Sequence, residues 1–361
     1  MNDKLLRYSV DVILRHQLPS GAYPACPTMP DYQYCWFRDS SFIAHAMLIS
    51  GEVASAEAFH TWAALTVLQY ESGARRAMAD FSAGKVPNPH EILRARYTYD
   101  SGKGPDEWPE FQLDGLGTWL WALKAFVDAG NTLSDEVYRA AHFVADYLTV
   151  LWPSNCHDLW EESGERVHTY TVAAIYGGLQ AAGDLLKRPQ LCKTAETIKA
   201  YVLKNMVSNG RFIKSVGNPI VDASLLGLAT PYRLVEPDDP LMVATVKQIE
   251  ADIYAAGFGV HRYRGDVYYA GGAWLLLEAW LGWYDTEVGN TARAATILGD
   301  IERNATASGD LPEQVVPPML ADVSNYDYWV KVRGTIATPL LWSHAMYLIT
   351  AHAVKAAAVV S

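Results

Sequence analysis

Three glutamates are the residues best placed for acid–base chemistry, and two of them follow a tryptophan. In the run Asp158-Leu159-Trp160-Glu161-Glu162, two adjacent carboxyl groups come directly after an indole. Adjacent residues do not face the same way, so Glu161 and Glu162 cannot share one role. A carboxyl group beside an indole keeps its proton to higher pH because desolvation disfavours the charged form, which suits a general acid. The alternative is a pair of solvated glutamates ahead of a helix, where negative charge is favourable.

The third glutamate is Glu313, in the run Pro312-Glu313-Gln314. An isolated loop glutamate is usually only a surface residue. Glycoside hydrolysis, however, requires two carboxyl groups on opposite sides of one bond. Glu313 is therefore a candidate for the second group.

Aromatic and charged residues gather in the segments between the expected helices. Tyr32, Trp36, Arg38 and Asp39 lie within 31–45, and Trp108 lies within 106–121. Rings can cover the apolar face of a sugar, and an Arg-Asp pair can bind its hydroxyl groups. Two further interpretations stay open for this segment: Ser40 or Asp39 as a helix N-cap, and a cation–π contact between Arg38 and Trp36.

Two further segments have the same character. The segment 259–274 contains Arg262 and several tyrosines, and the segment 338–347 contains Trp342 and His344. A lone histidine in a helix is more often a packing residue than a catalyst, so we interpret His344 as structural.

Helical periodicity dominates the elements that must position these residues. Val137, Ala141, Val144, Leu148 and Leu151 repeat at the 4-3-4-3 spacing of one helix face. Comparable stretches predict about a dozen helices and few strands. Segments rich in Gly, Pro and Asp separate them, at 19–35, 73–90, 100–114, 153–167, 208–220, 257–271 and 305–334.

No low-complexity linker divides the chain, so we predict a single all-α domain over residues 1–361. A dozen amphipathic helices suit either a solenoid or a closed (α/α)6 toroid. A solenoid should show a sequence repeat of fixed period, and this chain has none. The toroid is favoured, with its function carried by the loops at one rim.

Composition excludes several classes of partner. The net charge of −11 disfavours nucleic acid. The four cysteines and ten histidines have no metal-ligand spacing, so we expect no metal and no other cofactor. No apolar run is long enough to span a membrane. We expect a cytoplasmic protein; the oligomeric state stays open.

Taken in order, six motifs resemble glycoside hydrolase family 15, the glucoamylases and their relatives. They are Y-x-Y-x-W-x-R-D at 32–39, W-x-x-x-Q-x-D-G at 108–115, D-L-W-E-E at 158–162, R-Y-x-x-D-x-Y-Y at 262–269, P-E-Q at 312–314 and W-S-H-A at 342–345. The resemblance covers nearly the whole chain. It implies an (α/α)6 toroid and inverting hydrolysis of α-linked glucosides.

The resemblance also implies a role for each matching residue. Glu161 would be the general acid, Glu313 the general base, and Glu162 a contact to the leaving sugar. The terminal glucose and the attacking water would be contacted by Arg38, Asp39, Arg262, Trp108 and Tyr32, with Trp36 and Trp160 as further binding residues.

The substrate expected from this resemblance is short. The sequence contains neither the β-sandwich of many bacterial relatives nor the linker and starch-binding module of many fungal ones. We therefore expect exo-hydrolysis of short α-gluco-oligosaccharides of isomaltose or maltose type, with isomaltose favoured by analogy. The rival functions are those of an (α/α)6 disaccharide phosphorylase, a trehalose hydrolase, and a non-catalytic sugar-binding helical protein.

Overall fold

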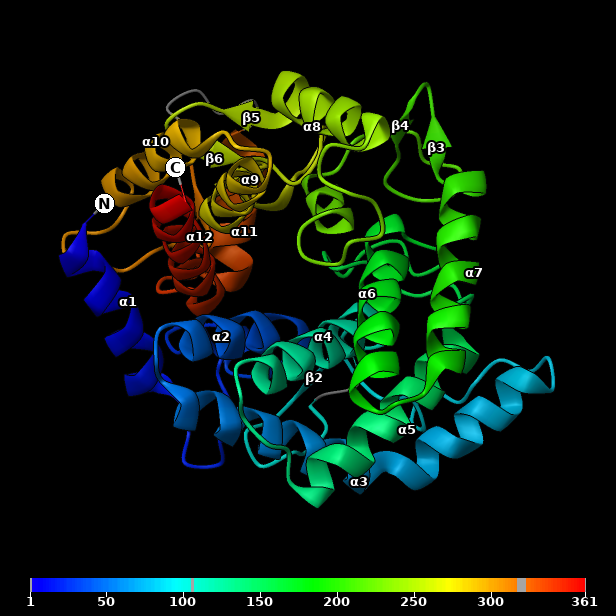
Figure 1. Ribbon diagram of the computed structural model, residues 1–361. Helices are drawn as coiled ribbons and strands as arrows, with labels where there is room; N and C mark the ends of the chain where they lie inside the picture. Colours follow the sequence, from blue (N-terminus) through cyan, green and yellow to red (C-terminus); the bar gives the residue numbers. More distant parts are fainter. Residues whose placement is uncertain (1, 105–106, 317–322, 361) are drawn as a thin grey trace.

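Helices follow one another around a ring and alternate between its outside and its inside (Figure 1). The structure is a computed structural model that describes residues 2–104, 107–316 and 323–360. Buried hydrophobic residues from Leu5 to Val354 form one continuous core between the two layers. This architecture is the (α/α)6 toroid predicted from the sequence.

Six elements form the inner layer, and each packs against the next until the last meets the first. Five are α-helices, whereas the fourth is a short 3-10 helix, η2. In order they are α2 (Phe37–Ile49), α4 (Asp114–Asp128), α6 (Thr169–Leu185), η2 (Ala223–Leu228), α9 (Leu275–Glu287) and α12 (Leu341–Val360).

Neighbouring inner helices approach closely where glycines face each other. A Cβ on Gly117 of α4 would lie 2.4 Å from the carbonyl oxygen of Ala174, and one on Gly178 of α6 would lie 2.4 Å from that of Gly117. Any side chain at these positions would separate the two helices. The glycines at the start of α4 therefore serve packing between neighbouring inner helices.

The outer layer consists of amphipathic helices with one buried face. In α5 the buried residues include Val137, Ala141, Val144 and Leu148, which confirms the periodicity predicted there. The outer helices are α1 (Asp3–His16), α3 (Val53–Ser82), α5 (Asp135–Leu151), α7 (Pro189–Asn205), α8 (Pro240–Ile253) and α10 (Thr291–Arg303).

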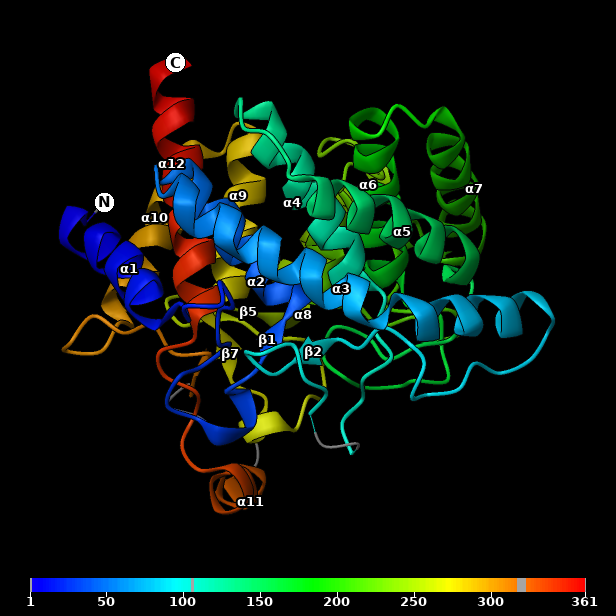
Figure 2. The same ribbon diagram turned by 90° about the horizontal axis from the view of Figure 1, so that it is seen from below.

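Short strands lie at one rim of the ring. Figure 2 shows β1, β2, β7 and α11 on the same side of the helices. Strands β1 (Cys35–Trp36) and β2 (Arg96–Tyr97) pair with each other, as do β3 (Val207–Ser208) and β4 (Arg211–Phe212). A four-stranded antiparallel sheet joins β5 (Tyr254–Ala255), β6 (Gly259–Val260), β7 (Ala273–Trp274) and β8 (Gln314–Val315).

The sequence interpretation was wrong in two of the segments expected between helices. Helix α3 continues to Ser82, into the segment 73–90, where exposed polar pairs such as Glu71–Arg75 support it in place of an apolar stripe. Helix α11 (Val323–Arg333) lies within 305–334. It packs on the rim turn η3 (Tyr268–Ala270) instead of on the core, so it has no strong apolar periodicity.

Candidate active site

A cavity of about 410 Å³ opens at the rim that carries the strands. Its walls come from the segments that precede five inner helices (α2, α4, α6, α9 and α12), from the first turns of α2 and α12, and from α11. All ten residues singled out from the sequence line this cavity: Tyr32, Trp36, Arg38, Asp39, Trp108, Trp160, Glu161, Glu162, Arg262 and Glu313. Folding thus brings together motifs that span almost three hundred residues of the chain.

Glu161 occupies a turn and faces the indole of Trp36. The Trp36 N–H donates to Glu161 Oε1 over 2.7 Å, and Gln112 Nε2 lies 3.4 Å from the same oxygen. The backbone of Glu161 has a φ of 69°, in the left-handed region that few non-glycine residues adopt. Such a conformation persists only where its surroundings impose it.

The indole that hydrogen-bonds to Glu161 is not that of its sequence neighbour Trp160. Trp160 precedes Glu161 in the sequence, but its indole N–H donates to Asp222, 2.9 Å from Oδ2. The N–H that reaches Glu161 belongs to Trp36, which the pairing of β1 with β2 positions. Adjacent residues point in different directions, so the sequence neighbour is not the spatial one.

Glu162 is held by two residues of the segment after β6. Tyr263 donates its hydroxyl to Glu162 Oε2 over 2.6 Å, and Arg262 Nη2 lies 3.3 Å from Oε1. Burial raises the pKa of Glu162, although Arg262 and Tyr263 act in the opposite direction. Its side chain keeps 35% of its surface exposed, so it remains open to a ligand.

Glu313 is buried directly before β8. Its backbone N–H donates to the carbonyl oxygen of Ala337 over 2.9 Å. Burial raises the pKa of Glu313 to about 8, even though the Tyr32 hydroxyl, Arg262 and Gln314 lower it. The Tyr32 hydroxyl also lies 3.0 Å from that of Tyr268.

Arg38 and Asp39 form a buried charged pair at the base of the cavity, at the start of α2. Arg38 Nε lies 3.2 Å from Asp39 Oδ1, and Arg38 Nη1 lies 2.9 Å from Gln112 Oε1 and 3.3 Å from Asp114 Oδ2. Burial raises the pKa of Asp39 to about 6, with Arg38 lowering it. The pair is therefore both an internal ion pair and part of the cavity wall.

Arg262 is fixed by a second carboxylate. Its Nε donates to Asp266 Oδ2 over 2.6 Å, and its Nη2 contacts the other oxygen of the same side chain. This two-point contact orients the planar guanidinium. Arg262 also lies beside the ring of Trp160, 5.3 Å from its centroid.

Two residues of α11 that line the cavity, Trp329 and Arg333, were not predicted from the sequence. Trp329 donates its indole N–H to the carbonyl oxygen of Val267 over 3.0 Å, and Arg333 pairs with Asp31 at 2.6 Å. Both line the cavity. The aromatic run at 325–329, within a segment otherwise expected to be loop, was the available signal. Tyr268, Trp274 and Trp342, from the motif-bearing segments, also line the wall.

His344 has the structural role expected for it. The backbone N–H of Leu311 donates to Nε2 over 3.0 Å, so Nδ1 carries the proton and donates to Ser9 Oγ over 2.9 Å. Both ring nitrogens are thus satisfied inside the core. Across the described ranges, no cluster of three or more His, Cys, Asp or Glu side chains could hold a metal ion.

None of the helices within residues 2–104, 107–316 and 323–360 combines the length and apolar character of a membrane-spanning segment.

Comparison with known proteins places the chain in a family. A sequence model described as glycosyl hydrolases family 15 matches residues 1–308. Isomaltose glucohydrolase of Kribbella flavida is 42% identical over 356 residues, which cover 96% of this chain and 92% of that protein. Trehalase 1 of Sulfolobus acidocaldarius is 26% identical, over 98% of this chain and 64% of that protein.

Solved structures agree with this placement. A glycosidase variant in complex with glucose superposes with a TM-score of 0.92 at 39% identity, over 98% of this chain and 96% of that one. A bacterial glucoamylase complexed with acarbose shares the fold, with a TM-score of 0.77 at 19% identity over 97% of this chain and 55% of that one. The chain belongs to glycosyl hydrolases family 15 and is a glycoside hydrolase.

Proposed function

We propose that this enzyme is an exo-acting, inverting α-glucosidase that releases β-D-glucose from the non-reducing end of short α-gluco-oligosaccharides. One observation carries the proposal: Glu161 and Glu313 line the same cavity, together with Arg38, Asp39 and Arg262. Two carboxyl groups around one sugar-sized space are what glycoside hydrolysis requires, and inversion is the outcome that the resemblance to family 15 implies.

The proposed reaction assigns opposite proton transfers to the two glutamates. Glu161, protonated, donates its proton to the glycosidic oxygen as the bond from that oxygen to the anomeric carbon breaks. Glu313, ionised, accepts a proton from the water whose oxygen bonds to the opposite face of that carbon. The configuration inverts, and the second sugar leaves with its hydroxyl group restored.

The remaining cavity residues bind and orient the sugars in this proposal. Arg38, Asp39 and Arg262 hold the terminal glucose. Their ion pairs already order these side chains, so binding costs less side-chain conformational entropy. Glu162 contacts the leaving sugar. Tyr32, beside Glu313, holds the attacking water. Burial and the proximity of Glu313 raise the pKa of Tyr32, so its hydroxyl stays neutral.

Isomaltose is the substrate that we favour. The relative that matches 96% of this chain at 42% identity is named isomaltose glucohydrolase. Trp329 and Arg333 line the cavity from α11, at the rim where a longer chain would extend. Trehalose is the second candidate, because several more distant relatives are named trehalases.

A phosphorylase and a non-catalytic sugar-binding protein are both less well supported. A phosphorylase uses phosphate in place of a general base, whereas Glu313 occupies the cavity here. A non-catalytic sugar-binding protein would not need paired carboxyl groups. For location, we propose the cytoplasm: all four cysteines are free and three are buried, which suits a reducing compartment.

Proton NMR of a fresh reaction with isomaltose tests the proposed function. The anomeric signal of β-glucose should appear before that of α-glucose, which mutarotation then produces. If α-glucose appears first, the two-carboxylate inverting scheme is wrong. Turnover that requires added phosphate would instead identify a phosphorylase.

A further inference from the structure

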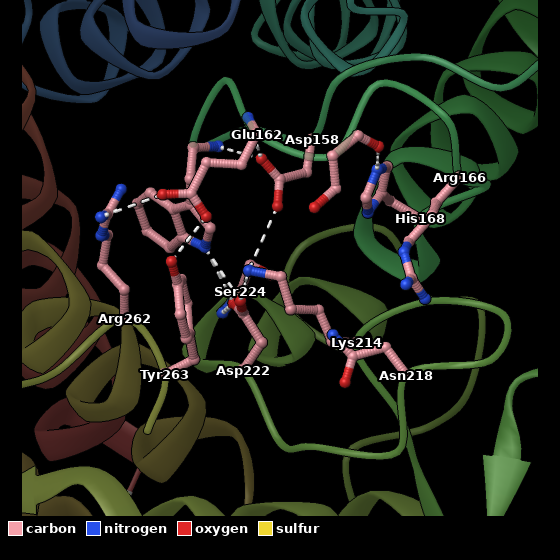
Figure 3. Close-up of polar contacts among 12 residues, drawn as sticks. Asp158, Glu162, Arg166, His168, Lys214, Asn218, Asp222, Ser224, Arg262 and Tyr263 are labelled. Atoms are coloured by element: carbon pink, nitrogen blue, oxygen red, sulfur yellow. Dashed lines mark hydrogen bonds and ion pairs between the residues drawn. The ribbon is translucent and has the colours of Figure 1, made fainter. Parts of the chain in front are cut away.

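Behind the turn that carries Glu161 lies a buried cation, Lys214, that does not line the cavity (Figure 3). It follows β4 and is 7% exposed. Its Nζ lies 2.8 Å from Asp222 Oδ2 and 3.2 Å from Asp158 Oδ2. It also lies 3.7 Å from the centroid of the Tyr263 ring.

Each of these three partners holds a residue of the turn 158–162. Asp158 Oδ1 accepts from the backbone N–H groups of Trp160 and Glu162, each over 2.9 Å. Asp222 accepts from the indole N–H of Trp160. Tyr263 donates to Glu162. Trp160 and Glu162, the residues on either side of Glu161, are therefore hydrogen-bonded to side chains that contact the ammonium group of Lys214.

Glu161 needs such support because its own backbone is unfavourable. Its φ of 69° lies in the left-handed region, where Cβ crowds the chain. Its backbone N–H donates to the carbonyl oxygen of Asp158 over 2.9 Å, which closes the turn. If the turn relaxed, the carboxyl group would leave Trp36 and the cavity.

Charge balance explains why a lysine occupies this position. Burial alone would lower the pKa of Lys214, but Asp222 and Asp158 outweigh it and raise the pKa. Burial would raise the pKa of Asp222, but Lys214, together with hydrogen bonds from Ser224, outweighs burial and lowers the pKa. Without the cation, two carboxylates would face each other in a buried space, and that arrangement is unstable.

We propose that Lys214 is a positioning residue for the general acid: its ammonium pairs with Asp158 and Asp222 and thereby fixes the turn that presents Glu161 to the glycosidic oxygen. This inference rests on the proposed function, since it takes Glu161 as the proton donor. If Lys214 has this role, its replacement should slow only the step in which Glu161 protonates the leaving group.

The test compares two substrates that differ in their need for an acid. Isomaltose loses an alcohol, which must be protonated, whereas α-D-glucosyl fluoride loses fluoride, which departs without a strong proton donor. We expect Lys214→Met to lower kcat on isomaltose by about 10²-fold, the loss typical of a misplacement of about 1 Å. On the fluoride, kcat should change by less than about 3-fold.

Three reference variants make the comparison decisive. Glu161→Gln should show the same selective loss on isomaltose; if it loses activity equally on both substrates, the proposed function itself is wrong. Lys214→Arg keeps the charge and should recover part of the loss on isomaltose. Arg293→Met removes another cation that pairs with two carboxylates, Glu250 and Asp285, outside the cavity, and should lower Tm without changing the substrate ratio.

The inference is overturned if Glu161→Gln is selective while Lys214→Met lowers both activities in the same proportion. It is also overturned if Arg293→Met shifts the substrate ratio, because the ratio would then report general destabilisation. If Lys214→Met does not fold, Asp222→Asn replaces it. That variant keeps one acceptor oxygen, in the position of Oδ1, for the N–H groups of Trp160 and Ser224, and it removes the negative charge that pairs with Lys214. It should show the same selectivity to a smaller extent, and equal losses on both substrates would contradict the inference.

Discussion

The indole N–H of Trp36 donates to Oε1 of Glu161 over 2.7 Å, although 125 residues separate them in the sequence. A donor at this position stabilises the carboxylate that remains once Glu161 has released its proton. Trp36→Phe keeps an aromatic ring but removes the donor. We expect kcat on isomaltose to fall by about 10-fold, the effect of losing one hydrogen bond to a charged group.

Steady-state kinetics separate this role from simple packing. If Trp36→Phe raises KM and leaves kcat unchanged, Trp36 acts only as a wall of the sugar site. Tm should be measured in parallel, because Trp36 is also buried.

The three glutamates should differ in the kinetic step that each affects. We expect Glu161→Gln and Glu313→Gln each to lower kcat on isomaltose by at least about 10²-fold, since each removes a proton transfer. Glu162→Gln should mainly raise KM, because Glu162 is proposed to bind the leaving sugar. A larger loss of kcat in Glu162→Gln than in Glu161→Gln would reverse the assignment within this pair.

The pH dependence of kcat/KM should report the buried carboxyl groups of the free enzyme. A general base must be ionised, and burial raises the pKa of Glu313 to about 8. The scheme also needs Glu161 protonated, so the logarithm of kcat/KM plotted against pH should be bell-shaped, and one of its two limbs should break near pH 8, where Glu313 titrates. Protonation of Asp39 below about pH 6 should lower kcat/KM further on the acid side.

A profile measured from pH 4 to pH 10 covers both limbs. Asp39→Asn should remove the additional loss below about pH 6 and leave the break near pH 8. A profile with no break between pH 7 and pH 9 would contradict the role of Glu313 as a titrating catalytic group.

A conservative substitution of Arg38, in the buried ion pair with Asp39, should lower catalytic activity more than it lowers stability. Arg38→Lys keeps the positive charge beside Asp39 and Asp114 but loses the planar fork. We expect a folded protein with kcat/KM lowered by about 10-fold or more. Arg38→Ala should also lose stability, because it leaves buried carboxylates unpaired.

Activity must be expressed per folded molecule, with Tm measured for each variant. Normal activity in the folded fraction of both variants would make Arg38 a structural ion-pair residue only.

Helix α11 should limit substrate length. Trp329 lines the cavity and contacts the ring of Tyr268, with centroids 4.9 Å apart. Trp329→Ala should therefore raise kcat/KM on soluble starch relative to isomaltose. The wild-type enzyme should prefer substrates of two to four glucose units over starch.

Tyr328→Ala is the matched control, since this neighbour on the same helix is 56% exposed and does not line the cavity. It should leave the ratio between the substrates unchanged. Starch as the best wild-type substrate would contradict the size limit, and maltose far ahead of isomaltose would contradict the preferred linkage.

The sequence by itself determined the helical ring and the residues that meet at its rim. An outer helix such as α5 repeats Val137, Ala141, Val144 and Leu148 within a few turns, so its buried face is a local property. The ten candidate site residues were predicted because six motifs, weak singly, occur in the order that is typical of glycoside hydrolase family 15. In the structure all ten line one cavity.

Only the tertiary structure decided which groups contact each other across the ring. Trp36, and not the adjacent Trp160, donates to Glu161, because the pairing of β1 with β2 sets the direction of that indole. Lys214 lies beside Asp158 and Asp222, and α11 brings Trp329 and Arg333 to the rim. These contacts join residues far apart in the chain. They form only when the helical ring closes, and the spacing of apolar residues along a single helix does not specify that closure.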